Sequence, residues 1–196
     1  MGQWKRLALA MTVLTAACQS PTQPASDLAA RGGAAVFAAS NASPGSVTGG
    51  GIYRFADTSD VRFNFNAVAR PDGSAVGHLF QSFVFGGELI EFRGRVTCVS
   101  FDEAEGRAWV GGVVTENTST HPQFTTPRTQ VGRDIWFRVL DGGEGANADE
   151  ADRSTIPGFE GDRNVVTSAE YCATRPWVEG NVATHPLTDG NIQVKP

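Results

Sequence analysis

Lysine is almost absent from this sequence. Only Lys5 and Lys195 occur among the 196 residues, and arginine supplies the other fourteen cations. These cations form no cluster, whereas nucleic-acid-binding proteins neutralise phosphates with grouped lysine and arginine side chains. The chain also has 21 acidic residues and a net charge of −5. These features argue against nucleic acid as a partner.

The short motifs that mark common catalytic and nucleotide sites are also missing. There is no G-x-S-x-G motif for an activated serine, and Gly49–Gly51 lacks the lysine and the helix of a phosphate loop. The three histidines, His78, His121 and His185, are far apart and have no metal-ligand spacing. A secreted hydrolase with an unmarked active site stays open as an alternative, but no catalytic residue is predicted.

The apolar run Leu7–Ala17 is too short to cross a membrane. It follows Lys5 and Arg6 and ends in small residues, which is the pattern of a secretory signal peptide. We expect residues 1–17 to be that signal peptide. Its removal takes away two cations and changes the net charge to −7.

The residues before Cys18, Leu14-Thr15-Ala16-Ala17, resemble the lipobox of bacterial lipoproteins. In that family the following cysteine is lipidated and becomes the new N-terminus, which implies lipidation of Cys18. The family usually has leucine three residues before the cysteine, where Thr15 stands here. Residues 18–46 are rich in small residues and proline, as in a flexible linker. The resemblance implies an exported protein anchored by lipid to a membrane of the bacterial cell envelope; the alternative is simple secretion with Cys18 incidental.

Two cysteines remain, Cys98 and Cys172. In an exported protein such a pair most simply forms a disulfide, which would stabilise the fold by about 4 kcal/mol. The rival interpretation is a reactive thiol, which needs an electropositive site. The uncharged neighbours of both cysteines favour the disulfide.

Strand patterns separated by turn signals run through most of the chain. Residues 61–69 alternate apolar and polar side chains, and Pro71-Asp72-Gly73 is a turn sequence. Residues 92–115 are predicted to form a hairpin across the 102–106 loop, with Val96 and Cys98 on one face and Val99 and Phe101 on the other. The opposite orientation of Val99 directs the disulfide away from the sheet, towards the Cys172 segment.

No stretch before residue 140 has a helical period longer than a turn. We therefore expect residues 47–196 to form a single antiparallel all-β domain of about seven or eight strands, either a β-sandwich or a small β-barrel. Long loops are expected in the C-terminal third, followed by a closing strand at residues 192–194.

From Gly49 onwards the chain has a Gly-rich opening, a Phe63-Asn64-Phe65 strand, the Cys98 hairpin, an Asp-Gly-Gly-Glu-Gly loop at 141–145 and a terminal Gly190-Asn191-Ile192 strand. This order of features resembles a group of exported bacterial β domains of unknown function. The resemblance implies the fold and implies no activity.

The acidic loop at residues 141–152 is the best candidate for a binding site. It offers oxygen atoms for a calcium ion, which takes six to eight such ligands, from Asp141, Glu144, Asn147, Asp149 and Asp152. The spacing is not that of an EF-hand, and acidic loops are more often solvated. No other cofactor is expected.

We therefore expect a cell-envelope binding or structural module whose partner is an unknown envelope protein or glycan. A calcium-dependent adhesion or carbohydrate-binding module is the alternative that would use the acidic loop. Most aromatic residues fall on alternating strand positions and are expected in the core. Trp177, beside Pro176 in a loop, is the one expected at the surface.

Overall fold

The computed structural model describes residues 44–55, 59–144, 148, 150–178 and 181–196. The predicted signal peptide at 1–17, the lipidation candidate Cys18 and most of the predicted linker lie outside these ranges. Among the described residues, no helix has both the length and the apolar character needed to cross a membrane. All the elements below belong to the unit that spans Ala39–Pro196.

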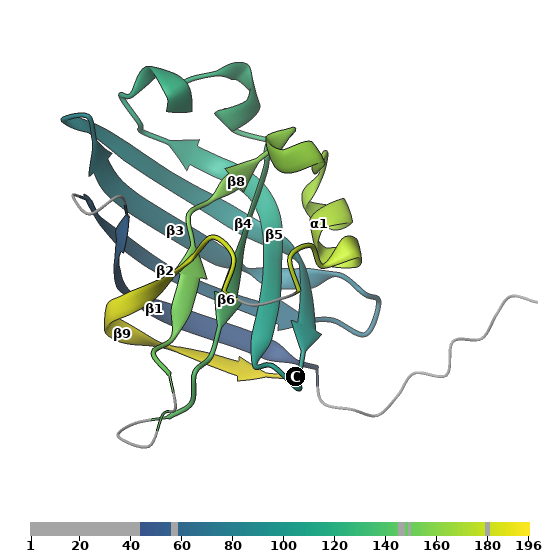
Figure 1. The fold of residues 1–196 in the computed structure, drawn as a ribbon. Helices are drawn as coiled ribbons and strands as arrows, with labels where there is room; N and C mark the ends of the chain where they lie inside the picture. Colours follow the sequence, from purple (N-terminus) through teal and green to yellow (C-terminus); the bar gives the residue numbers. More distant parts are fainter. Residues whose placement is uncertain (1–43, 56–58, 145–147, 149, 179–180) are drawn as a thin grey trace, which may run out of the picture. The chain divides into compact units, whose positions relative to one another are not determined.

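The described residues form nine strands, all paired antiparallel (Figure 1). They are β1 (Ser46–Phe55), β2 (Ser59–Ala69), β3 (Ala75–Phe85), β4 (Glu88–Asp102), β5 (Arg107–Asn117), β6 (Asp134–Leu140), β7 (Arg153–Thr155), β8 (Gly158–Phe159) and β9 (Thr184–Lys195). Neighbours follow the order β5-β4-β3-β2-β1-β9-β7-β6-β8, and β5 also pairs with β6. The sheet therefore closes into an eight-stranded barrel, to which β8 adds one extra strand.

The expected antiparallel all-β fold is thus confirmed in its barrel form. The sandwich alternative is wrong, because one continuous ring of pairing leaves no second sheet. The expected long loops of the C-terminal third are also wrong, since that part supplies β7, β8, β9 and the helix α1 (Ser168–Thr174). The closing strand β9 covers twelve residues and pairs with both β1 and β7. The sequence predicted only residues 192–194 of it, because apolar and polar residues do not alternate regularly around Gly190.

The barrel interior is filled with side chains. The alternation in β2 places Val61, Phe63 and Phe65 inside, as expected, and leaves the intervening side chains mostly exposed. Inward residues of the other strands complete one apolar cluster, among them Tyr53, Phe83, Ile90, Phe92, Val110, Phe137 and Ile192. Gln81 is a polar exception: it is buried, and neither its amide oxygen nor its nitrogen has a hydrogen-bond partner among the described residues.

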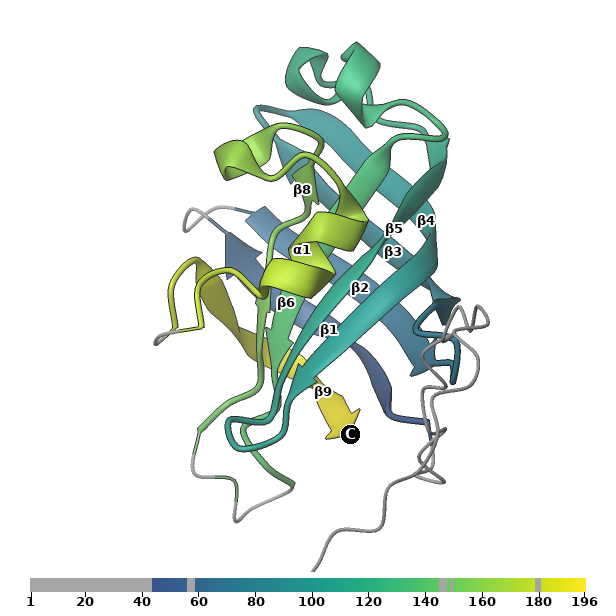
Figure 2. The same ribbon diagram turned by 90° about the vertical axis from the view of Figure 1, so that its right-hand side faces the viewer.

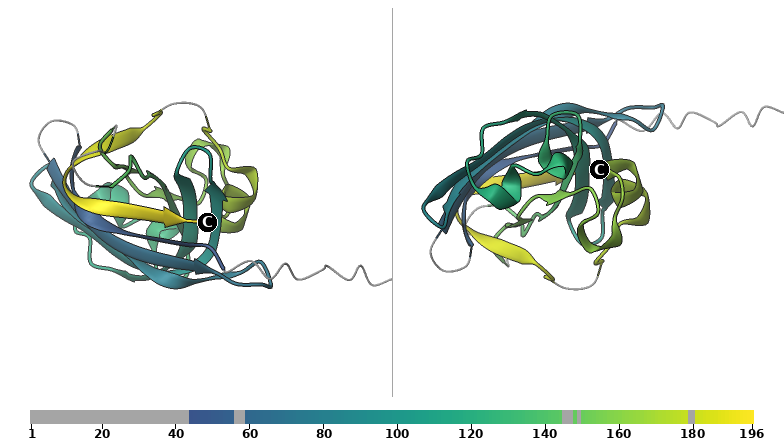
Figure 3. Two further views of the ribbon diagram at one scale, coloured as in Figure 1. Left: turned by 90° about the horizontal axis from the view of Figure 1, so that it is seen from below. Right: turned by 90° about the horizontal axis from the view of Figure 1, so that it is seen from above.

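One end of the barrel is covered by the connection between β5 and β6. This connection contains two 3-10 helices, η1 (Pro122–Phe124) and η2 (Pro127–Thr129), which lie across that end when the barrel is seen from above (Figure 3, right). The ring of Phe124 packs on Phe92 and Phe159, with centroid distances of 5.9 and 6.3 Å. An aromatic side chain therefore closes the interior at this end.

The predicted hairpin at 92–115 forms from β4 and β5. The pairing register shifts at Thr97, which makes this residue a bulge. Val96 consequently faces the barrel core while Cys98 bonds outwards, so the expectation that they share a face is wrong. Val99 packs against the core, which confirms that it lies on the face opposite to Cys98.

Helix α1 lies on the outer wall of the barrel against β5, with further contacts to β4 and β6 (Figure 2). The predicted disulfide between Cys98 and Cys172 is present and joins β4 to the helix, with 6.2 Å between the two Cα atoms. At the start of the helix, the backbone N–H and the hydroxyl of Ser168 donate to Asp134 Oδ1 at 2.8 and 2.5 Å. The helix is therefore fastened to the barrel at both ends.

Candidate functional site

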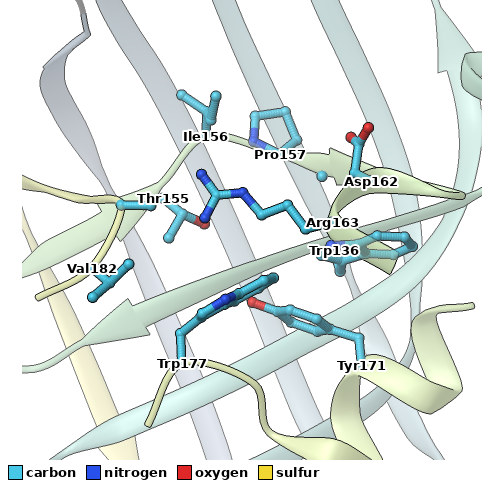
Figure 4. A pocket seen from close by; sticks show the side chains of 11 residues that line it. Trp136, Thr155, Ile156, Pro157, Asp162, Arg163, Tyr171, Trp177 and Val182 are labelled. Atoms are coloured by element: carbon cyan, nitrogen blue, oxygen red, sulfur yellow. The ribbon is translucent and has the colours of Figure 1, made fainter. Parts of the chain in front are cut away.

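A cavity of about 210 Å³ lies on the outer wall of the barrel, between β6 and the segments around α1 (Figure 4). Typical small-molecule sites have volumes of about 300 to 1,000 Å³, so this cavity suits a small solute or one ring of a larger ligand. Its lining is mostly aromatic and aliphatic, and comprises Trp136, Thr155, Ile156, Pro157, Gly158, Asp162, Arg163, Tyr171, Trp177, Val182 and Ala183.

Three aromatic rings form one wall of the cavity. Trp136 from β6 and Tyr171 from α1 are stacked, with centroids 5.6 Å apart and ring planes 23° apart. Trp177 follows at 6.1 Å from Tyr171. A Cβ atom at Gly158 would lie 2.3 Å from Trp136 Nε1, so only glycine lets the β8 backbone approach this indole so closely.

The segments 176–178 and 181–183 supply Trp177, Val182 and Ala183 to the lining, and polar side chains hold these segments to the barrel. Three backbone carbonyl groups of these segments accept hydrogen bonds from the barrel wall: Pro176 from the Trp109 indole, Val178 from Arg107 and Val182 from Arg138. All three donor side chains are buried. The position of these segments is therefore set by the outer faces of β5 and β6.

Several lining residues have an unfavourable backbone conformation. Arg163, Trp177 and Ala183 have φ angles of 52°, 59° and 57°, in the left-handed region that costs a residue with a Cβ about 1 to 2 kcal/mol. Such conformations persist where the surrounding structure enforces them, and they cluster at binding and catalytic sites. Their presence in this lining points to the cavity as a functional site.

The hydroxyl group of Tyr171 is the titratable group of the aromatic wall. Burial raises the pKa of Tyr171 well above its ordinary value, and the charges of Arg138 and Arg163 only partly oppose this. The hydroxyl therefore stays protonated at neutral pH and can donate a hydrogen bond. Arg163 also lies over Trp177, with its Cζ atom 5.3 Å from the ring centroid.

The lining offers no free base for acid–base catalysis among the described residues. Its carboxylate, Asp162, is paired with Arg128 at 2.6 Å and accepts the backbone N–H of Phe159 at 2.8 Å. None of the histidines lines the cavity. His185 stacks on Tyr53 with centroids 5.5 Å apart, and burial, with a smaller contribution from Arg153, lowers the pKa of His185. The arrangement suits binding better than proton transfer.

The acidic loop lies elsewhere, along β9. Asp152 Oδ2 accepts the backbone N–H of Ile192 at 2.5 Å, and Asp141 Oδ2 accepts that of Val194 at 2.9 Å. The second carboxylate oxygen of each residue accepts an N–H of the loop itself. These two carboxylates therefore bind the last strand of the barrel.

The other predicted calcium ligands are not brought together by the described structure. Glu144 accepts a hydrogen bond from the side chain of Gln193 at 2.8 Å, and Asn147 and Asp149 lie outside the described residues. Within those that are described, no group of three or more His, Cys, Asp or Glu side chains is arranged to hold a metal ion. Calcium binding by this loop stays an untested prediction.

We predict that Asp152→Asn lowers the free energy of unfolding by about 2 kcal/mol at pH 7, the size of a hydrogen bond to a charged group. Asp152 is 7% exposed and accepts two N–H groups, whereas an asparagine side chain would turn its own N–H₂ towards one of them. Urea unfolding measures this loss. Asp189→Asn, at an exposed position of β9, should change stability by less than about 0.5 kcal/mol; equal effects of the two variants would contradict the prediction.

Sequence reasoning predicted none of the cavity residues as a binding residue. Trp177, expected at the surface, is half-buried in the lining. Trp136, expected in the core, is buried outside the barrel, in a second cluster with Trp109 and Tyr171. A signal for α1 was present: Thr167 caps the N–H of Glu170, whose carboxylate accepts the N–H of Val166, which resembles a capping box.

These observations define an eight-stranded antiparallel barrel protein with a small aromatic and cationic cavity on its outer wall. Comparison of the chain with protein-family models, curated proteins and solved structures found no match.

Proposed function

We propose that the protein is an exported binding module that holds a small solute, or one ring of an envelope glycan or protein ligand, in the cavity beside α1. The observation that carries this proposal is the aromatic wall of Trp136, Tyr171 and Trp177, built with a strained backbone at the cavity. Flat aromatic faces supply large contact areas at little cost in side-chain freedom. A purely structural barrel has no need of such a cavity.

Binding is a better proposal than hydrolysis for this site. A hydrolase needs a nucleophile or a base within reach of the substrate, and Asp162 is already paired with Arg128. The disulfide between Cys98 and Cys172 holds α1, and with it Tyr171, on the barrel. This supports a preformed site that works outside the reducing cytoplasm.

The place of action that we propose is the bacterial cell envelope, with a lipid anchor at Cys18. The signal-like segment at 1–17 and the lipobox-like residues before Cys18 support this. We expect a labelled fatty acid to be incorporated into the wild-type chain and not into Cys18→Ala. Equal labelling of both proteins would contradict the anchor.

The binding proposal is tested with ring-sized probes and the variant Trp177→Ala. Nuclear magnetic resonance titration of the full chain with benzoate, benzamide, glucuronate and methyl glucoside should shift signals of the cavity residues for at least one probe. We expect Trp177→Ala to weaken that binding about five- to tenfold, since an aromatic contact contributes about 0.5 to 1.5 kcal/mol. Melting curves of the variant separate lost binding from lost folding.

Phe80→Ala is the matched control, because Phe80 also lies under an arginine, Arg93, with 4.7 Å from its ring centroid to the guanidinium carbon. This pair comes from β3 and β4, away from the cavity lining. We expect the control to bind the probes as the wild type does. Failure of all four probes to shift cavity residues, or wild-type binding by Trp177→Ala, would sink the proposed function.

A further inference from the structure

The charges beside the cavity are unbalanced in a protein that is acidic as a whole. Arg107 and Arg138 lie on the paired strands β5 and β6, two register positions apart, and the positive charges of Arg107 and Arg163 both act on Arg138. Among the described residues, Arg107 is near Glu105 at 3.8 Å, but neither Arg138 nor Arg163 forms an ion pair with a carboxylate. The site therefore has an excess of positive charge.

Arg138 is the least compensated of these cations. Arg138 is 1% exposed, its Nη2 donates to the Val182 carbonyl, and its Nη1 has no hydrogen-bond partner among the residues that the structure describes. Burial is the main cause that lowers the pKa of Arg138, but a guanidinium group does not lose its proton in proteins. An unpaired buried charge is strongly unfavourable, and an anion bound nearby would relieve this.

The cavity can place an anion within reach of these charges. Val182, which accepts the Arg138 hydrogen bond, is part of the lining. Tyr171 and Arg163 also line the cavity on either side of Trp177 (Figure 4), whose ring centroid lies 6.1 Å from that of Tyr171 and 5.3 Å from Arg163 Cζ. The charges of Arg138 and Arg163 both lower the pKa of Tyr171, although burial outweighs them. Because both residues line one cavity of about 210 Å³, the Tyr171 hydroxyl and the Arg163 guanidinium are two donors available to an anion bound there.

We propose, on the basis of the binding function above, that the solute is a carboxylate on a ring-sized body, held by Arg163 and the Tyr171 hydroxyl in front of Arg138. The ring of the ligand packs on the aromatic wall, and its carboxylate accepts hydrogen bonds from the two donors. A monoanion fits this mostly apolar lining better than phosphate, whose second charge would be costly to desolvate. Aryl carboxylates and sugar acids share this chemistry.

The test compares each carboxylate with its neutral counterpart on the full chain: benzoate with benzamide, and glucuronate with methyl glucoside. We expect at least one carboxylate to bind ten times more tightly than its counterpart, measured by titration of tryptophan fluorescence and by resonance shifts of cavity residues. The better of the two carboxylates identifies the body as an aromatic or a sugar ring. Inorganic phosphate binding as tightly as the better carboxylate would overturn the assignment.

Arg163→Gln should abolish the preference for the carboxylate and keep the affinity for the neutral probe. Tyr171→Phe should reduce the preference for the carboxylate. Arg93→Gln is the matched control, since Arg93 also lies over an aromatic ring, and it should leave the preference unchanged. Arg163→Gln with an intact preference would overturn the inference.

The results separate this inference from the function on which it rests. If benzamide or methyl glucoside binds as tightly as its carboxylate and Trp177→Ala loses both, the cavity is a binding site and the carboxylate inference is wrong. If none of the probes shifts the cavity residues, the binding function itself fails.

Discussion

Replacing Cys98 and Cys172 together by alanine is expected to lower the free energy of unfolding by about 4 kcal/mol. The two cysteines are 74 positions apart, so their bond removes much of the conformational freedom of the unfolded chain. The same bond joins α1 to β4, which means that the helix in the variant is held mainly by Ser168, Asp134 and its packing on β5. Urea unfolding under non-reducing conditions, followed by tryptophan fluorescence, measures the loss.

A reducing agent provides the control for this prediction. The wild-type chain in reductant should become as unstable as the double variant, whereas the variant itself should not respond to reductant. Two free thiols in the folded wild-type chain, measured by mass under non-reducing conditions, would contradict the disulfide. Unchanged urea midpoints in the double variant would contradict its stabilising role.

The second large effect is expected from Phe92→Ala, which should cost about 3 to 5 kcal/mol, the usual range for a buried phenylalanine. Phe92 is fully buried in the barrel, and its ring lies 4.7 Å from Phe159 and 5.9 Å from Phe124. Truncation would leave a cavity where β4, the extra strand β8 and the covering connection meet. Chemical denaturation of the purified variant measures the cost.

Phe80→Ala is again the natural comparison, because Phe80 lies on β3, next to β4, but on the outer face of the barrel. Its side chain is half-buried and covered by Arg93. We expect this variant to lose less than about 1.5 kcal/mol, since it removes contacts without opening the core. Similar losses in both variants would show that the barrel interior is not the main source of stability.

The barrel walls could be predicted from the sequence because their pattern is local. Alternation in β2 and the turn after it specify a strand, a buried face and a return of the chain. Closure of the ring is not local. It depends on the pairing of β9 with β1, whose partner residues are more than 130 positions apart, and on the pairing of β5 with β6 across a long connection. Sandwich and barrel could therefore not be distinguished from the sequence alone.

The Cys98–Cys172 pairing was predictable, but the local geometry of Cys98 was not. The bulge at Thr97 faces the glycine pair of β5, and a Cβ atom at Gly111 would lie 2.7 Å from Cys98 Sγ and 2.8 Å from Ser168 Cβ. The glycine and the bulge together make room for α1 and the disulfide. Such a fit depends on three segments at once, and no single pattern in the chain expresses it.

The cavity was largely hidden for a similar reason. Arg138 alternates with inward residues of β6, so its sequence position predicts an ordinary solvent-exposed arginine. Its burial arises only because α1 and the chain around Val182 cover the outer wall. The burial of Arg138 can therefore be seen in the structure, but the alternation of apolar and polar residues in β6 does not predict it.

The hydrogen bonds of Asp141 and Asp152 to β9 have a consequence for strand alignment. A slip of β9 by two residues along β1 would keep the inward and outward faces, so hydrophobic alternation cannot exclude it. Such a slip would take the N–H groups of Ile192 and Val194 away from the two carboxylates and leave a buried Asp152 without one of its donors. The two carboxylates of the acidic loop therefore favour one register of β9 on β1, the register in which the barrel closes with both carboxylates hydrogen-bonded.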